Sequence, residues 1–256
     1  MISTNYLDRC DAITQGINAM NNTAINGECD GVYVGTNEYD REVTFECLAN
    51  ATAIPQSCHI GFSSWFNFDI IIARKSSRAI LIDFNPNTKT FLVETLNQVV
   101  TSENRTDFAD KIREYIRLNE SKFALNCNVQ EYDYSHCTFP YEEVQCELNI
   151  PGNWLNTDEG FDYIKKLANE GKIAVITEDI SSHEALEKIS RVVKENKYVI
   201  DTLYVANISQ YFKGNEECFV NSIHLLSCDE TKIVHCPDSL VQKVIEGKNV
   251  SRELLF

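Results

Sequence analysis

The sequence lacks several features that would place it in a common functional class. No apolar run approaches the roughly 20 residues that cross a bilayer, and the first 15 residues carry Asn, Asp and Arg where a signal peptide needs an apolar core. No G-x-x-x-x-G-K-[ST] element is present, which argues against a P-loop nucleotide triphosphatase. No Lys/Arg cluster stands out, and the formal net charge of −15 argues against nucleic acid as a partner.

The cysteines leave two interpretations of the compartment open. There are ten, at positions 10, 29, 47, 58, 127, 137, 146, 218, 228 and 236, with no C-x-x-C pair. An even count together with N-x-S/T sequons is typical of a secreted, glycosylated protein. The absence of a signal peptide favours reduced, buried thiols in an intracellular protein, although the mature start of a secreted chain would look the same.

The cysteines and histidines do not predict a metal site. The sequence contains three adjacent pairs that invite a zinc interpretation, which are Cys58-His59, His136-Cys137 and His235-Cys236. Neighbouring residues of a strand point to opposite faces, and the short ligand spacings of structural zinc sites are missing. We therefore expect no metal. A Cys–His nucleophilic pair stays open, because such pairs meet in space and the sequence selects no one cysteine.

The organising stretch is a predicted strand–helix–strand unit over residues 55–83. Residues 55–61 predict a strand, 62–65 a turn with Ser64 as its helix cap, 66–75 an apolar helix, and 79–83 a second strand that ends at Asp83. The run AILID shows no polar alternation, as in a strand of a parallel sheet that is covered on both faces. Asn85-Pro86-Asn87 then ends the strand and starts a helix. Such a unit is half of a nucleotide-binding fold.

Alternating segments continue this pattern and predict one domain over residues 1–256. Residues 51–118 form its first half and 157–256 its second, with strands at 172–177 and 198–206 and helices between. Residues 119–156 are an aromatic and Cys-rich insert, which is either a lid, a partner surface or an irregular segment burying its own aromatics. Residues 1–50 are an extension with a helix at 6–20 and strands at 31–34 and 43–48. At the C-terminus we expect an antiparallel pair, 218–225 and 232–235, and a helix at 240–245.

The predicted fold class is therefore α/β, with a mainly parallel central sheet, flanking helices and terminal antiparallel strands. Right-handed crossovers place the carboxyl ends of all parallel strands at one edge, where such sheets bind ligands. The polar residues expected at this edge are Gly61, Asp83, Asn85, Glu178, Asp179 and Asn207. They predict a site there.

Each of these residues also has an ordinary structural interpretation. Asp83 can accept hydrogen bonds from ribose hydroxyls or cap the following turn, and Asp179 can face a ligand or cap the helix that begins near Ser181. Glu178 can serve as a general base if burial raises its pKa, or stay solvated. Asn207 can orient an amine or a carbonyl, or complete a strand-end turn.

Three stretches resemble a poorly characterised bacterial family that has the fold of class I SAM-dependent methyltransferases. They are IGFSSWFNFDIIIARKSSRAILIDFNPN (60–87), AVITEDISSHEALEKI (174–189) and DTLYVANISQYF (201–212). Asp83 lies 22 residues after Gly61, close to the spacing of nucleotide-binding units. The resemblance implies S-adenosylmethionine (SAM) as cofactor, bound by Gly61, Ser63, Asp83 and Asn85, with catalysis by Asp179, Glu178 and Asn207.

Two departures from that family concern the cofactor turn and the third strand end. The turn has one glycine, where methyltransferases have a Gly-rich G-x-G, and Phe62 or Trp65 can occupy the cofactor's space. Glu178-Asp179 stands where the family has Gly-Asp.

Two hypotheses about function follow from this comparison. The first is methyl transfer from SAM to an unknown protein or small-molecule acceptor. The second is an inactive methyltransferase-fold protein that works as a protein-interaction module. Both suit a cytoplasmic bacterial protein, or an effector that is delivered into a host cell.

Overall fold

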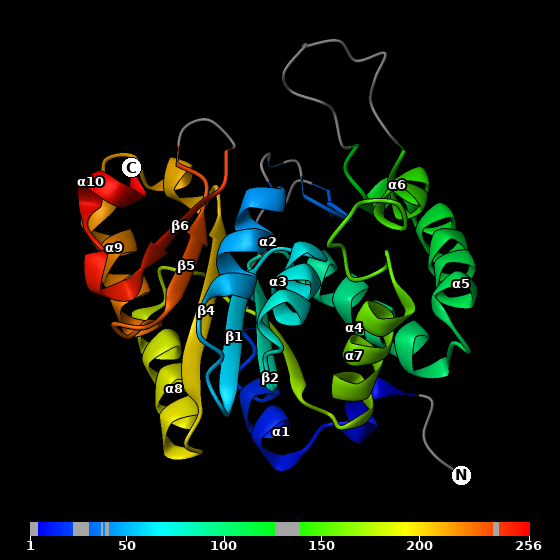
Figure 1. Cartoon of the computed structure of the whole chain (residues 1–256), viewed down its shortest axis with the longest axis horizontal. Helices are drawn as coiled ribbons and strands as arrows, with labels where there is room; N and C mark the ends of the chain where they lie inside the picture. The colour runs from blue at the N-terminus through cyan, green and yellow to red at the C-terminus, as the bar shows by residue number, and fades with distance from the viewer. Residues whose placement is uncertain (1–4, 23–30, 37, 39–40, 126–138, 238–240) are drawn as a thin grey trace.

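The computed structural model describes residues 5–22, 31–36, 38, 41–125, 139–237 and 241–256 (Figure 1). The strands are β1 (Ser57–Phe62), β2 (Arg78–Asp83), β3 (Ile173–Thr177), β4 (Val199–Ala206), β5 (Lys232–His235) and β6 (Lys243–Glu246). The α-helices are α1 (Ala12–Asn18), α2 (Arg41–Asn50), α3 (Phe66–Arg74), α4 (Pro86–Thr101), α5 (Arg105–Leu118), α6 (Pro140–Glu147), α7 (Asp158–Asn169), α8 (His183–Glu195), α9 (Glu216–Leu225) and α10 (Arg252–Leu255). Short 3-10 helices are η1 (Tyr6–Arg9), η2 (Glu120–Lys122), η4 (Ile208–Phe212) and η5 (Gly247–Asn249).

The strands form one six-stranded sheet in the order β3-β2-β1-β4-β5-β6. Strands β1 to β5 are parallel, and β6 pairs antiparallel with β5. The chain moves from β1 outward to β3 on one side and from β4 outward to β6 on the other. The strand order therefore reverses between β1 and β4, which is the switch point where doubly wound sheets bind ligands. The predicted fold class is confirmed.

Helices cover both faces of this sheet, as Figure 1 shows. On one face Ile60 of β1, Ile80 of β2 and Ile176 of β3 pack in a cluster with the apolar side chains of α8 and α9. On the other face Leu81 and Val175 pack in a cluster with those of α4, α5 and α7. The short apolar runs are therefore buried on both sides, as their lack of polar alternation predicted.

The N-terminal extension closes the outer edge of β3 with side chains. The backbone N–H of Val175 donates to Asn18 Oδ1 at 3.0 Å, and that of Thr177 to Asn21 Oδ1 at 2.7 Å. The backbone N–H of Ile173 donates to the Tyr6 hydroxyl at 3.1 Å. These side chains satisfy groups that an edge strand otherwise leaves open. The predicted helix over 6–20 is thus η1 followed by α1.

Four local predictions were wrong. Residues 43–48 lie in α2, where Thr44 and Leu48 form its buried face. Residues 31–34 contain a single bridge, from Val32 to Phe123. Residues 218–225 lie in α9, because β5 runs parallel to β4 and a parallel neighbour needs a crossover. The antiparallel strand is instead β6, within the segment expected to be a helix; residues 238–240 lie outside the described part.

The insert is in part helical. It contains α6, where the Arg113 Nε of α5 donates to the Tyr141 carbonyl at 3.2 Å. The rings of Phe139 and Tyr141 stack with centroids 5.6 Å apart. Residues 126–138, which include Tyr132 and Tyr134, lie outside the described residues.

A buried ion pair joins α3 to β4. Arg74 donates from Nε to Asp201 Oδ2 at 2.8 Å and from Nη2 to Oδ1 at 2.6 Å, and both side chains are almost wholly buried. The remaining guanidinium hydrogens go to the carbonyls of Leu48, in the last turn of α2, and of Ala51 and Thr52 just after it, each at 2.8 Å. One side chain thus connects three segments.

Arg74→Met is expected to lower the free energy of unfolding by about 3–5 kcal/mol, because it leaves the Asp201 carboxylate buried without its partner. Urea unfolding measures this. The matched control is Arg117→Met, which removes an exposed pair with Glu114 and should cost less than about 1 kcal/mol. Equal losses in the two variants would contradict the role assigned to Arg74.

Candidate functional site

The carboxyl ends of the parallel strands bring the predicted site residues to one edge of the sheet. Asp83 ends β2 and pairs in register with Thr177 of β3, and the Glu178 N–H donates to the Asp83 carbonyl at 3.0 Å. Gly61 of β1 pairs in register with Leu81 on one side and Tyr204 on the other. Asn207 follows β4 directly. These four predicted residues therefore lie along this edge, with β1 between the acids and Asn207.

The turn from β1 to α3 is held by Asn67, a residue that the sequence did not single out. Its Nδ2 donates to the carbonyls of Phe62 at 3.0 Å and Ser64 at 2.8 Å. Its Oδ1 lies 2.9 Å from His59 Nε2, and His59 Nδ1 lies 2.7 Å from the Thr202 hydroxyl. His59 therefore donates from Nε2, and burial lowers its pKa to about 4, so the ring is neutral at physiological pH.

Gly61 leaves room for this amide. A Cβ built at Gly61 would lie 1.7 Å from Asn67 Oδ1 and 2.6 Å from His59 Nε2. The glycine is thus required by a contact within the protein. Its predicted role in cofactor binding stays a prediction.

The backbone at Ser63 has the conformation that glycine favours. Its φ is +73°, in the left-handed region. Ser63 stands where the second glycine of a G-x-G spacing that begins at Gly61 would be. Neither aromatic residue of the turn points into the edge. Phe62 packs in the cluster under α8 and α9, whereas Trp65 packs under α4 and donates from Nε1 to the Thr95 hydroxyl at 3.0 Å. Ser64 does not cap α3 through its side chain, since the cap position is Trp65.

Asp83 connects β2 to both neighbouring turns. Its Oδ1 accepts from the Asn85 N–H at 2.7 Å, and the Ser63 N–H and the Thr88 hydroxyl also hydrogen-bond this carboxyl group. Burial raises the pKa of Asp83 to about 6, although these three hydrogen bonds lower it in part. Asn85 caps α4, with its Oδ1 accepting from the Asn87 N–H at 2.9 Å. The capping interpretation of both residues therefore holds alongside any ligand role.

Glu178 and Asp179 differ in burial. Glu178 is 4% exposed, and its Oε1 accepts from the Asp179 N–H at 2.8 Å and from Asn22 Nδ2 at 3.3 Å. Asp179 is exposed, and its Oδ1 accepts from the Ser181 N–H at 2.7 Å. Asp179 thus shapes the turn before α8 and does not serve as its N-cap, which is Ser182.

Asn207 follows a strained strand end. Ala206 has a φ of +48°, and the pairing of β4 with β5 shifts register just before it. Asn207 is half-buried and precedes η4. Tyr204, three residues earlier on β4, belongs to a polar cluster that the sequence did not predict, in which Glu38 Oε2 accepts from the Tyr204 hydroxyl and from Gln242 Nε2, both at 2.9 Å. Burial raises the pKa of Glu38.

Two of the three adjacent Cys and His pairs, Cys58-His59 and His235-Cys236, lie in the described part of the chain. Cys58 packs in the apolar cluster under α8 and α9, whereas His59 points to the opposite face. His136 and Cys137 lie outside the described residues. In the part of the chain that the structure describes, no group of three His, Cys, Asp or Glu side chains is arranged to hold a metal ion.

Among the described helices, none is both long and apolar enough to cross a membrane.

A family model described as "Domain of unknown function (DUF7790)" matches residues 33–236. This match spans β1 to β5 and every predicted site residue. The chain belongs to this family. The family description states no activity, and a search of curated proteins finds no match.

Among solved structures, the chain is similar to the rRNA methyltransferase aviRa from Streptomyces viridochromogenes. The TM-score is 0.40 and the sequence identity 12%, over 88% of this chain and 82% of that one. A likeness at this level assigns no substrate or activity.

Ser63→Gly is expected to raise the free energy of unfolding by about 1 kcal/mol, because the left-handed conformation costs a residue with a Cβ roughly that amount. Urea unfolding measures it. The matched control is Ser182→Gly, where φ is −78° and glycine should be destabilising by about 0.5 kcal/mol. If both substitutions lower the free energy of unfolding, the backbone at Ser63 does not have the left-handed conformation described above.

The free energy of unfolding of Asp83→Asn, relative to that of the wild-type protein, is expected to increase as the pH rises. Because the folded-state pKa of Asp83 is raised to about 6, its carboxyl holds a proton at pH values where the unfolded chain has lost it. The wild-type protein therefore loses stability as the pH rises through 6, and the asparagine variant avoids this loss. Urea unfolding of both proteins at about pH 4.5 and about pH 7.5 measures the change. A stability difference that stays constant between these pH values would show that the pKa is not raised.

Proposed function

We propose that this protein binds SAM at the carboxyl edge of its sheet and transfers the methyl group to an unknown protein or small-molecule acceptor. The observation that carries the proposal is the position of Asp83. It ends the strand next to β1, beside the switch point, and hydrogen-bonds to the left-handed turn at Ser63. An acid at the end of the second strand is the usual ribose-binding group of a nucleotide-binding unit.

The residues at this edge fit such a cofactor. A carboxylate offers about four acceptor positions, and three donors within the protein use the Asp83 carboxyl group, which leaves room for a ribose hydroxyl. Asp83 is half-buried and so is accessible to a ligand. Phe62 and Trp65 lie in the cores, which removes the steric objection that the sequence raised.

Bound SAM would supply an electrophilic methyl group, and the protein would contribute positioning. We assign Asn207 to orienting the acceptor, because no described residue hydrogen-bonds its half-buried side chain and it follows the strained Ala206. Glu178 is the acid best protected from water among the predicted catalytic residues, and we assign it to accepting a proton. Asp179 would hold the turn that carries Glu178.

A second candidate function, a protein-interaction module without SAM, is favoured by the turn itself. The Trp65 N–H already donates to the Val34 carbonyl at 3.3 Å, and the Ser63 N–H is bonded to Asp83. Fewer backbone donors are therefore free than in a Gly-rich cofactor turn. The partner would be an unknown protein. A cytoplasmic location or delivery into a host cell suits either function.

Isothermal titration with SAM and with S-adenosylhomocysteine tests the first function. We expect micromolar binding of both ligands by the wild-type protein and a loss of affinity of about tenfold or more in Asp83→Asn, because a charged acceptor is replaced by a neutral one. Asp229→Asn, an exposed acid that precedes β5 at the opposite edge, is the matched control and should bind normally. If neither ligand gives a measurable heat of binding, the enzyme hypothesis is contradicted and the interaction module is favoured.

A further inference from the structure

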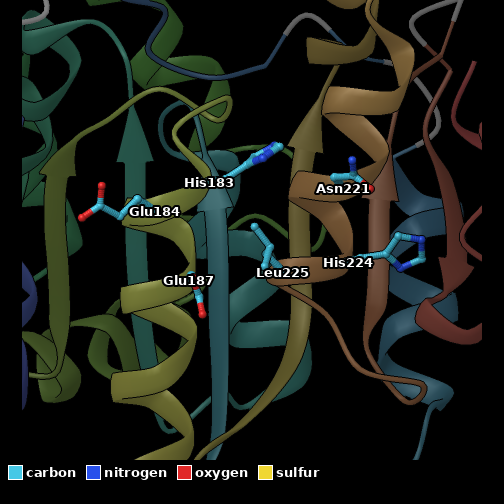
Figure 2. A pocket seen from close by; sticks show the side chains of 6 residues that line it. All are labelled: His183, Glu184, Glu187, Asn221, His224 and Leu225. Carbon is cyan, nitrogen blue, oxygen red and sulfur yellow. The ribbon is translucent and has the colours of Figure 1, made fainter.

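A groove of about 530 Å³ lies between α8 and α9, away from Asp83 and Ser63. It is lined by His183, Glu184, Glu187, Asn221, His224 and Leu225. In Figure 2 the side chains of His183 and Leu225 lie between the two helices, whereas Glu184 points away from α9. The groove is therefore polar at its rim and apolar at Leu225, and it is large enough for a small organic molecule.

A cysteine and a histidine meet beside this groove. Cys218 Sγ lies 3.6 Å from His183 Nε2, and the same nitrogen lies 3.1 Å from the Cys218 carbonyl oxygen. Cys218 is half-exposed and sits in the first turn of α9, a ten-residue helix whose N-terminal end favours negative charge. With the ring hydrogen on Nδ1, the bare Nε2 can accept the thiol proton, and it can then donate that hydrogen to the carbonyl oxygen or to the thiolate.

The other described cysteines lack this environment. Burial raises the pKa of Cys10, Cys58 and Cys236, and burial and three neighbouring glutamates raise that of Cys146. Raised values hold these sulfurs in the unreactive thiol form. Cys228 bonds to the Thr231 hydroxyl at 3.3 Å, and Cys47 is exposed on α2. Cys218 is thus the described cysteine that has a ring nitrogen within hydrogen-bonding distance.

We propose that Cys218 and His183 form a reactive thiol site that exchanges with low-molecular-weight disulfides held in the groove. The thiol proton passes to His183 Nε2, and the Cys218 sulfur attacks one sulfur of the disulfide. The disulfide bond breaks as the new bond forms, and the departing thiolate takes the proton from His183. One protein thiol and one disulfide give a mixed disulfide and one free small thiol, so Cys218 is oxidised and the departing sulfur is reduced.

The charges around the groove favour a neutral disulfide as the probe. Glu184 and Glu187 are paired with Lys188 and Arg191 one helical turn later. On α9, Glu216 is paired with Arg252. Because these carboxylates are already paired with basic side chains, we expect the groove to discriminate little between ligands of different charge. We therefore choose 2-hydroxyethyl disulfide, which is neutral and small.

The test measures the rate of mixed-disulfide formation at each cysteine of the native full-length chain, by acid quenching and peptide mass spectrometry. Cys218 is expected to react about tenfold faster than Cys47 and Cys146, although both are more exposed, because the thiolate is the attacking form. If Cys218 is not the fastest of these three, the proposal is overturned.

Two variants separate the histidine from the groove. His183→Gln keeps an N–H donor but cannot accept the thiol proton, so it should slow Cys218 about tenfold and leave Cys47 unchanged. His224→Gln, which changes the other histidine of the groove, should leave every rate unchanged. Cys58 is fully buried and reports unfolding, since its modification would reveal a variant that has lost its structure. An unchanged Cys218 rate in His183→Gln, with Cys58 protected, would also overturn the proposal.

Discussion

The amide of Asn67 connects the centre of the sheet to the turn at its edge. Through His59 it reaches Thr202 on β4, and through its own nitrogen it holds the carbonyls of Phe62 and Ser64. The same helix carries Arg74, about two turns further from the edge, which pairs with Asp201. Two polar side chains of α3 thus fix the spacing of β1 and β4. Because the switch point lies between these strands, the geometry of the candidate site depends on hydrogen bonds that never reach solvent.

The central part of the fold could be predicted from the sequence because burial on both faces leaves a clear pattern. The runs before Asp83 and Glu178 contain no polar alternation, and parallel strands buried under two helical layers need none. Once the strands were placed, chain connectivity put their carboxyl ends together, so the neighbouring positions of Asp83 and Glu178 followed. The left-handed conformation of Ser63 was not predicted, because a serine stands where a glycine would have indicated it.

The parts that could not be predicted depend on tertiary contacts. The segment 218–225 has the composition of a strand, but a crossover between parallel β4 and β5 requires a helix there. Glu38 lies in a segment without periodicity, so nothing local indicates that its carboxylate meets Tyr204. The polar role of Asn67 had one signal, an amide within an apolar helix, which becomes informative only when Gly61 is placed beside it. Residues that are distant in the sequence and come into contact only in the folded protein form no motif with a recognisable spacing.

The closure of the β3 border by Asn18, Asn21 and Tyr6 limits how this sheet could grow between molecules. A strand from another copy cannot add there, because the outward amides of Ile173, Val175 and Thr177 are already bonded. Among the described strands, β6 forms the other border of the sheet. Pairing of β6 with β6 about a two-fold axis uses that border in both molecules and ends at two copies. Growth of the described sheet through its β3 border is therefore blocked.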